Sequence, residues 1–497
     1  MSRLIQSAGN VSFNIALIVC LLYYSILFTF PNYLLNDPDT FWHIRTGQWI
    51  LDHAQVPTDD IFSYTAAGKP WISSEWLSEV FFATAFKFGG WQAVVALAAA
   101  ACSAVIGILS FYLVRHLRFS VAIGWTVITA LAISPHFLAR PHVFSYVLLA
   151  VWMIKLLDAC DTDGFELSSL FTFAPLMILW ANLHGSFTLG LVLLNVFVGC
   201  CLWQNIVQRN YTKCWHLLIL VLAVTLCALI TPYGISSALM TKEELNLKFA
   251  SEHIGELRSP DFQNAKFHLF FLVATLSAMV GLGIELRGVR LIAFSIIILI
   301  GLSYTRGLTI FFILIPIILA RPASTSAWWL APQLSKVQTS DSDKLSDPVL
   351  RFLEQRSILI VAGSMAIAAL VTVSTWSRAD VSPPEAIAPK AAIDFVQRTN
   401  INGNVFNDYD FGGYLIFRGI PTFVDGRDLP FGDAFLRRYF EAVALVDINT
   451  TFELLDEYKV TWVVLRPKAP LALALARSGQ WDEVYSDKSS IVLVQRK

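Results

Sequence analysis

The chain has 497 residues, of which 56% are hydrophobic and only 15% are charged, and its mean hydropathy is +0.59. This balance excludes a soluble globular protein and indicates an integral membrane protein. The net charge of −1 leaves no excess of Lys and Arg, so a nucleic-acid partner is also excluded. The seven Cys lie in or beside apolar segments, and their spacing predicts neither a disulfide framework nor a metal site.

About eleven apolar stretches approach the length that a bilayer core demands. They lie near 12–30, 91–114, 119–138, 143–159, 169–184, 186–203, 216–232, 268–284, 291–304, 308–320 and 357–376. The first has no small-residue cleavage pattern, so we expect an uncleaved span. The expected fold is a polytopic α-helical membrane protein with a transmembrane domain over residues 1–376.

Basic clusters predict the orientation of these spans. Such clusters lie near Arg3, at 115–118, at 209–213, at 287–290 and over 321–356, in alternate loops. With Arg3 inside, the outer loops are 31–90, the joints near Arg140 and His184, 232–267 and the turn at Arg306. Residues after Trp376 are then also outside, and the expected location is the cytoplasmic membrane of a bacterium.

The first outer loop, 31–90, contains a predicted amphipathic helix over residues 75–87. The residues expected to face lipid are Trp76, Leu77, Val80, Phe81 and Phe86.

Residues 377–497 are more polar and begin with a Pro-rich linker, which predicts a soluble extracytoplasmic domain. We expect helices over 391–397, 414–418, 436–445, 452–458 and near 470–478, and strands over 405–407, 422–425, 461–465 and 490–494. This alternation predicts a small α/β sandwich.

Ionisable residues gather on the predicted outer side, where each is a functional hypothesis. They are Asp37, Asp39, His43, Arg45, Arg140, His142, His184, Glu252, Glu256, Arg258 and Arg306. A carboxylate with several Arg and His at headgroup level could take a proton from a hydroxyl while neutralising a departing phosphate. That chemistry is glycosyl transfer from a lipid-phosphate donor, with Arg140, Arg258 and Arg306 as the leading phosphate ligands.

Each residue also has a structural explanation. Asp37 or Asp39 could cap the helix that follows. His184 could be an interhelical hydrogen-bonding residue, and Arg306, beside Tyr304, an interfacial anchor. These explanations do not predict that the residues share one face of the membrane.

Residues 39–45, Asp-Thr-Phe-Trp-His-Ile-Arg, resemble the first outer loop of GT-C superfamily glycosyltransferases, especially oligosaccharyltransferase catalytic subunits, which carry Asp-Pro-x-Phe-Asn-x-Arg. The resemblance implies that Asp39, rather than Asp37, is the catalytic or metal-binding carboxylate. It also implies outer-face catalysis and a membrane-embedded donor.

Two further segments are similar to that family. Residues 407–414, with 422–428 downstream, resemble the Trp-Trp-Asp-Tyr-Gly block that reads the acceptor sequon, although both Trp are absent here. This resemblance nominates Asp408, Asp410 and Tyr414 for acceptor binding. Residues 251–253 resemble the Glu-bearing outer loop, which adds Glu252 and, nearby, Glu256.

The family's second-loop acidic pair has no counterpart, since Arg140–Pro141–His142 stands there. Resemblance to the lipid-linked monosaccharide branch of GT-C implies a metal-independent Asp39 base. On that resemblance we expect no required cofactor, with Mg²⁺ or Mn²⁺ at Asp39 left open.

The predicted function is an inverting glycosyltransferase that moves a sugar from a polyprenyl-phosphate donor to a glycan, glycolipid or protein. Asp39 is the expected base, with Asp37 in support. The donor ligands are Arg45, His43, Arg140, His142, His184, Arg258 and Arg306. The alternatives are an oligosaccharyltransferase acting on protein and a non-enzymatic transporter or flippase of lipid-linked sugars.

Overall fold

The computed structural model describes residues 2–162, 164–245, 247–249, 255, 258–264, 266–281, 283–326, 348–378 and 381–496. The chain divides into two compact units. The helical unit comprises Met1–Pro31, Val95–Thr231 and Gly255–Ala379. The loop–sheet unit comprises Asn32–Val94, Pro232–Ile254 and Asp380–Lys497, and so joins most of the first predicted outer loop to the C-terminal residues.

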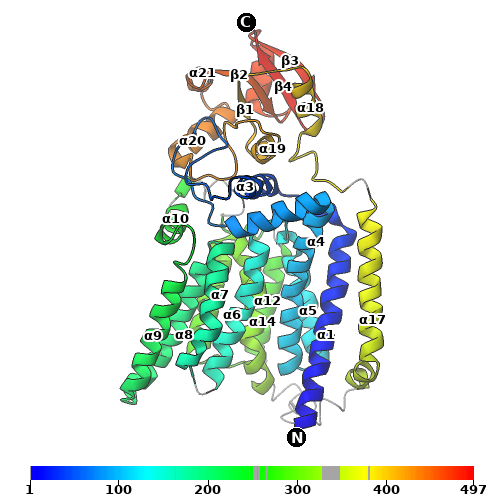
Figure 1. Ribbon diagram of the computed structural model, residues 1–497, viewed down its shortest axis with the longest axis vertical. Helices are drawn as coiled ribbons and strands as arrows, with labels where there is room; N and C mark the ends of the chain where they lie inside the picture. Colours follow the sequence, from blue (N-terminus) through cyan, green and yellow to red (C-terminus); the bar gives the residue numbers. More distant parts are fainter. Residues whose placement is uncertain are drawn as a thin grey trace. The chain divides into compact units, whose positions relative to one another are not determined.

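The helical unit consists of long apolar helices (Figure 1). They are α1 (Ser2–Thr29), the C-terminal part of α4 (Trp76–His116), α5 (Phe119–Ile133), α6 (His142–Asp161), α7 (Leu170–Leu183), α8 (Phe187–Val207), α9 (Tyr211–Cys227), α12 (Lys266–Gly281), α13 (Val289–Ser303), α14 (Thr305–Ser326) and α17 (Pro348–Trp376). Two short 3₁₀ turns, Ser134–His136 and Leu167–Ser169, precede α6 and α7.

Seven described helices are long and apolar enough to cross a membrane, which is the make-up of a multi-pass membrane protein. They are Val11–Thr29, Trp76–His116, Phe119–His136, His142–Asp161, Phe187–Val207, Thr305–Ser324 and Gln355–Trp376. The shorter apolar helices are Leu167–Leu183, Tyr211–Cys227, His268–Gly281 and Val289–Ser303. Every predicted stretch therefore contains a helix, but the count of about eleven spans is not confirmed.

The first and last helices of this unit, α1 and α17, lie side by side (Figure 1). Thr375 donates its hydroxyl to the Phe28 carbonyl at 3.2 Å, and Thr372 donates to the Tyr24 hydroxyl at 3.3 Å. Helices α13 and α14 form a tight hairpin at Gly307, where a Cβ would lie 2.1 Å from the Ile300 carbonyl oxygen. Only glycine permits this approach.

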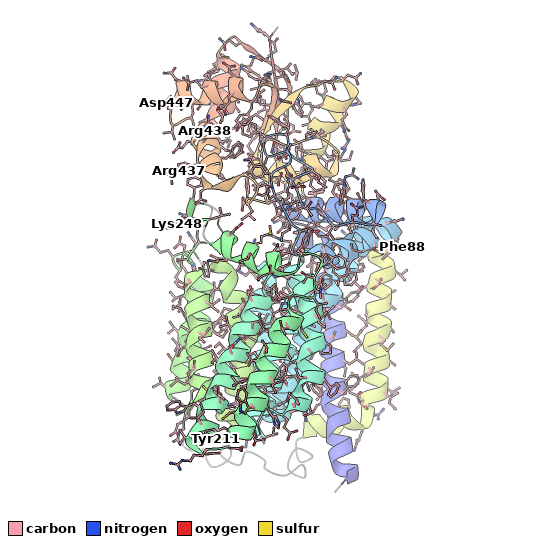
Figure 2. The ribbon with its side chains drawn as sticks, turned by 60° about the vertical axis from the view of Figure 1, so that its left-hand side comes forward. Phe88, Tyr211, Lys248, Arg437, Arg438 and Asp447 are labelled. Carbon is pink, nitrogen blue, oxygen red and sulfur yellow. The ribbon has the colours of Figure 1, made fainter. Side chains whose placement is uncertain are left out.

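Helix α4 bends at a glycine pair, because Gly90 has a φ of +59°. The bend separates the apolar span from the N-terminal part of α4, which matches the predicted amphipathic helix. Phe88 is 83% exposed and projects outward in Figure 2, and Phe81 is also exposed. The prediction that Phe86 faces lipid is wrong, since its ring packs against Trp91 and Phe417 at 5.0 and 5.4 Å between centroids.

The loop–sheet unit is built around a four-stranded mixed sheet in the order β1-β2-β4-β3. Its strands are β1 (Asn404–Asn407), β2 (Val460–Leu465), β3 (Trp481–Ser486) and β4 (Ile491–Gln495). β1 and β2 are parallel, so a long crossover joins them, whereas β4 is antiparallel to both β2 and β3. The helices are α2 (Pro31–Leu34), α3 (Asp39–His53), the N-terminal part of α4, α10 (Ile235–Leu245), α18 (Lys390–Arg398), α19 (Gly412–Phe417), α20 (Gly432–Val443), α21 (Ile448–Glu457) and α22 (Pro470–Arg477).

Successive strand side chains point to opposite sides of the sheet, and β1 and β2 are packed against apolar clusters on both sides. Phe406 and Val463 pack with residues of α20, α21 and α22 in one apolar cluster. Val405 and Trp462 pack in a second cluster with α18 and α19. Phe41 of α3 belongs to the second cluster, so the segment between α1 and α4 supplies part of the core of the predicted α/β sandwich.

Two strand predictions need correction. Residues 422–425 form no strand, because the Asn407 side chain takes the place of a strand neighbour. It accepts from the Phe423 N–H and donates to the Val424 carbonyl, each at 2.8 Å. β3 was not predicted, since its sequence Trp-Asp-Glu-Val-Tyr-Ser is largely exposed along an edge and lacks an apolar pattern.

Candidate functional site

Asp37 and Asp39 open helix α3, and both side chains are buried. The Asp37 Oδ1 accepts the Asp39 backbone N–H at 2.8 Å, so Asp37 has the capping role that its position allowed. The Asp39 Oδ1 accepts the indole N–H of Trp42 at 3.0 Å, one turn along the same helix. The first turn of a helix favours negative charge. Asp39 is therefore an oriented carboxylate in a place that stabilises its charge.

Three glycines of the C-terminal residues allow the backbone to pack closely around this carboxylate. A Cβ on Gly426 would lie 2.1 Å from the Asp39 Oδ1, and a Cβ on Gly413 would lie 2.1 Å from the Pro38 carbonyl oxygen. A Cβ on Gly412 would lie 2.4 Å from the Val424 carbonyl oxygen. Sequence reasoning missed Gly426, although its place in the Asp-Gly-Arg triplet of the family-like segment was a signal.

The residue after Gly426, Arg427, is fixed in a fully buried ion-pair network. Its Nε and Nη2 donate to the two carboxylate oxygens of Asp425 at 2.7 and 2.8 Å, and its Nη1 donates to Asp60 at 2.5 Å. Its guanidinium also lies between the rings of Phe62 and Trp71, 5.1 and 4.8 Å from their centroids. Burial alone would lower the pKa of Arg427, but the two carboxylates raise it overall. This arginine holds the 425–427 turn on the first loop.

His43 lies one turn after Asp39 in α3 and lies near two carboxylates. One belongs to Glu79 of α4, and the other to Glu75, the residue that precedes α4. The His43 Nδ1 is 3.1 Å from Glu79 Oε1, and its Nε2 is 3.7 Å from Glu75 Oε2. Ser73 donates its hydroxyl to the other oxygen of Glu79. Arg45 is half-buried and donates to the Gln48 side chain at 3.3 Å.

The three residues predicted for acceptor binding follow β1. Asp408 is buried, and its Oδ1 accepts the Asp410 N–H at 3.1 Å. Arg466 pairs with the Asp410 carboxylate and lies 3.6 Å from Asp408. Burial raises the pKa of Asp408 from 3.8 to about 6, while Arg466 acts in the opposite direction. Tyr414 is buried, and its hydroxyl accepts from Arg418 at 2.7 Å.

Tyr409 connects these residues to the Asp39 region. Its hydroxyl donates to Asp428 Oδ1 at 2.6 Å. Burial, and then the charges of Asp428 and Asp39, raise the pKa of Tyr409 well above its ordinary value. Tyr409 therefore remains a neutral hydrogen-bond donor to Asp428, near the Asp39 carboxylate.

Five predicted donor ligands lie in the helical unit. The Thr305 N–H and hydroxyl donate to the Arg258 carbonyl at 2.9 and 3.0 Å, so the structure brings Arg258 beside Arg306 in the chain turn between α13 and α14. Both arginine side chains are exposed.

Arg140 lies two residues before α6, and His142 is the first residue of that helix, with its Nε2 3.1 Å from the His136 carbonyl. The His184 Nδ1 accepts the Ser186 N–H at 3.0 Å before α8.

Glu252 and Glu256 lie outside the described residues. The neighbouring segment is fixed to α20, because the Lys248 and Phe249 N–H groups both donate to Asp433, at 2.9 and 3.1 Å. Arg437 lies over the Phe249 ring, and Figure 2 shows Lys248 near Arg437. Within the described parts of the chain, no group of three or more His, Cys, Asp or Glu residues is arranged to hold a metal ion.

No protein-family profile matches the chain, and no curated protein matches its sequence. The fold is similar to ArnT from Cupriavidus metallidurans, with a TM-score of 0.51 in the apo state and 0.50 bound to undecaprenyl phosphate. Each match has 14% identity and covers 96% of this chain and 97% of that chain. The Archaeoglobus fulgidus oligosaccharyltransferase tethered with an acceptor peptide matches at a TM-score of 0.49 and 11% identity, over 90% of this chain and 68% of that chain. The likeness to ArnT shows that the two chains share a fold.

Replacing Arg427 with Met should destabilise the protein by about 3–5 kcal/mol, because Asp60 and Asp425 would remain buried without a cation. Thermal unfolding in detergent measures the effect. Arg438→Met is the matched control, since Arg438 pairs with Glu457 at the surface and should change little. Equal melting temperatures for the two variants would contradict the structural role of Arg427.

The raised pKa of Asp408 predicts a pH-dependent stability. The folded state keeps a proton that the unfolded chain releases above 3.8, so this contribution is complete below 3.8 and is lost as the pH rises through about 6. Relative to Asp408→Asn, the wild type should lose up to about 3 kcal/mol of unfolding free energy between pH 4 and 7. Denaturant unfolding of both proteins across this range measures the difference. A wild-type unfolding free energy that stays constant or rises with pH relative to that of Asp408→Asn would contradict the assignment.

Proposed function

We propose that this protein is an inverting glycosyltransferase of the GT-C type, which transfers a sugar from a polyprenyl-phosphate donor to an acceptor outside the bacterial cytoplasmic membrane. The observation that carries the proposal is the Asp39 carboxylate, which the Trp42 indole orients and Gly426 closely approaches. The ArnT-like fold supports the reaction class, and the ArnT structure with undecaprenyl phosphate supports the choice of donor lipid.

In the proposed reaction, Asp39 removes the proton from an acceptor hydroxyl as its oxygen attacks the anomeric carbon of the donor sugar. The bond between that carbon and the donor phosphate oxygen breaks on the opposite side, so the anomeric configuration inverts. The polyprenyl phosphate leaves with the bonding electrons. Asp37 supports the base, because it holds the Asp39 backbone in place.

The leaving phosphate needs positive charge, and arginine supplies it through bidentate contacts. We assign Arg258 and Arg306 to this role, since hydrogen bonds at Thr305 bring their backbones together. The remaining donor ligands in the proposal are Arg45, His43, Arg140, His142 and His184. No step requires a divalent metal, and Asp39 is the group that Mg²⁺ or Mn²⁺ would contact.

The acceptor is assigned to the C-terminal domain, residues 377–497, through Asp408, Asp410 and Tyr414, together with Glu252 and Glu256 of the preceding loop. Asp408 and Asp410 are joined by a hydrogen bond and share Arg466. Tyr414 acts on the acceptor by holding Arg418.

Asp39→Asn should reduce transfer at least about 100-fold, because an amide cannot accept the acceptor proton. The assay uses the purified chain in lipid nanodiscs with a panel of radiolabelled undecaprenyl-phosphate monosaccharides and a cell-envelope extract as acceptor. Asp52→Asn, an exposed carboxylate of the same helix, is the control and should retain full activity.

Full activity of Asp39→Asn would remove Asp39 from the mechanism. Transfer only from an undecaprenyl-pyrophosphate oligosaccharide, and only to a peptide, would favour the oligosaccharyltransferase alternative instead.

A further inference from the structure

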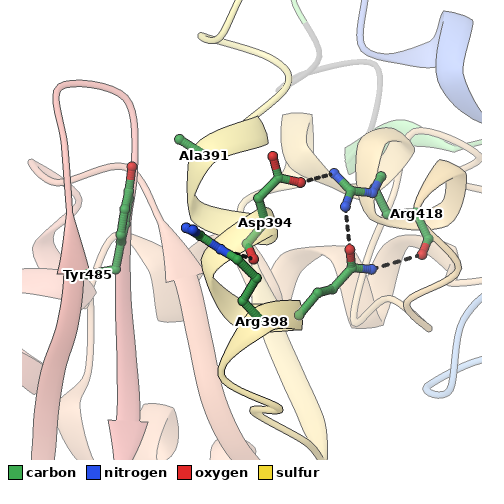
Figure 3. A pocket seen from close by; sticks show the side chains of 6 residues that line it. Ala391, Asp394, Arg398, Arg418 and Tyr485 are labelled. Atoms are coloured by element: carbon green, nitrogen blue, oxygen red, sulfur yellow. Dashed lines mark hydrogen bonds and ion pairs between the residues drawn. The ribbon is translucent and has the colours of Figure 1, made fainter.

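The C-terminal domain has an open pocket of about 780 Å³ between α18, the end of α19 and β3 (Figure 3). This volume is within the roughly 300–1,000 Å³ of small-molecule sites. Its lining residues are Ala391, Asp394, Gln397, Arg398, Arg418 and Tyr485. Nearly all of these side chains are polar, which favours a polar ligand.

One wall of the pocket is a fixed network around Arg418. Its guanidinium donates to the Asp394 carboxylate and the Tyr414 hydroxyl, each at 2.7 Å, and to the Gln397 side-chain oxygen. The Gln397 amide nitrogen donates back to the Arg418 carbonyl at 3.4 Å. Lys390 completes the group by pairing with Asp394 at 2.6 Å. This wall is therefore preorganised. Among the described lining residues Asp394 is the one carboxylate, and it is already paired with two cations.

Of the cations that line the pocket in the described part of the chain, Arg398 is the one that stays available. Its Nε donates to the Asp394 carbonyl at 3.2 Å, which fixes the base of the guanidinium, while its Nη1 and Nη2 donate to none of the described residues. Figure 3 shows this side chain extending from α18 toward the strand that carries Tyr485. Two open donors on a fixed guanidinium match the two oxygens of a carboxylate or phosphate group.

The opposite wall is aromatic. The Tyr485 ring packs against Phe395 with centroids 5.4 Å apart, and its hydroxyl donates to Asp487 at 2.6 Å. Ser489 and Ser490 donate to the same carboxylate, which directs the Asp487 charge into the β3–β4 turn. A rigid ring of this kind offers an apolar face beside a polar site.

We propose that this pocket binds an acidic sugar of the acceptor, with Arg398 holding its carboxylate or phosphate and Tyr485 supporting the sugar ring. That the ligand is the acceptor rests on the proposed function. The acceptor would then be an acidic glycan or glycolipid. The binding itself requires no donor and no transfer step.

The test is isothermal titration calorimetry of the full-length chain in detergent, with glucuronate, glucose and inorganic phosphate as probes. Glucuronate should bind more tightly than either glucose or phosphate, because only glucuronate offers both ring and oxyanion. Arg398→Ala should weaken the affinity for glucuronate at least about tenfold. The affinity of Arg398→Lys should lie between those of the wild type and Arg398→Ala, since lysine keeps the charge but lacks the two parallel N–H donors of the guanidinium.

Arg477→Ala is the matched control, because Arg477 is also exposed in the last turn of its helix, α22. It should bind glucuronate like the wild type. The proposal would be overturned if glucose or phosphate bound as tightly as glucuronate. It would also be overturned if Arg477→Ala lost as much affinity for glucuronate as Arg398→Ala.

The same experiment separates this inference from the proposed function. Asp39→Asn should lose transfer and still bind glucuronate. In transfer assays with an acidic acceptor, Arg398→Ala should raise the acceptor KM about tenfold and leave kcat unchanged. A change in kcat alone would contradict the binding role.

Discussion

The close approach of the Gly426 backbone to the Asp39 carboxylate is the constraint on which the proposed site depends. A Cβ at position 426 would lie 2.1 Å from the carboxylate oxygen that accepts the Trp42 indole N–H. Asp37 fixes the start of the helix, and the buried Arg427 network fixes the turn that carries Gly426. The carboxylate is therefore held from the helix side by hydrogen bonds and from the opposite side by contact.

This constraint places the segment after α1 and the C-terminal residues in one compact unit. Asp60 comes from the loop, whereas its partner Arg427 comes from the C-terminal domain, and both are fully buried. Phe41 lies in the core formed on one face of the sheet with Tyr414, at 5.1 Å between ring centroids. A buried charge is tolerated only when it is paired, so the loop and the domain stabilise each other. The pocket at Arg398 belongs to the same domain, which would join acceptor binding to the segment that positions the base.

Much of the architecture could be predicted from the sequence, because hydropathy and alternation reflect burial directly. Every predicted apolar stretch contains a helix, and the fold is shared with ArnT. The prediction of a strand at 422–425 was wrong because the Asn407 side chain replaces a strand neighbour, which no local pattern reveals. The prediction of Asp39 was possible from a motif, but the role of Gly426 requires two segments nearly 400 residues apart to meet. The same holds for Arg398, whose importance depends on which of its nitrogen atoms remain available.

The most direct test of this constraint is the turnover of Gly426→Ala. The added methyl group meets the tip of the Asp39 side chain, which can move, so the carboxylate should be displaced while the fold is retained. With Gly124→Ala as control, since a Cβ there meets nothing within 4 Å, we expect kcat to fall about 100-fold with unchanged donor KM and melting temperature. Wild-type kcat in a folded Gly426→Ala protein would contradict the positioning of Asp39 by this contact.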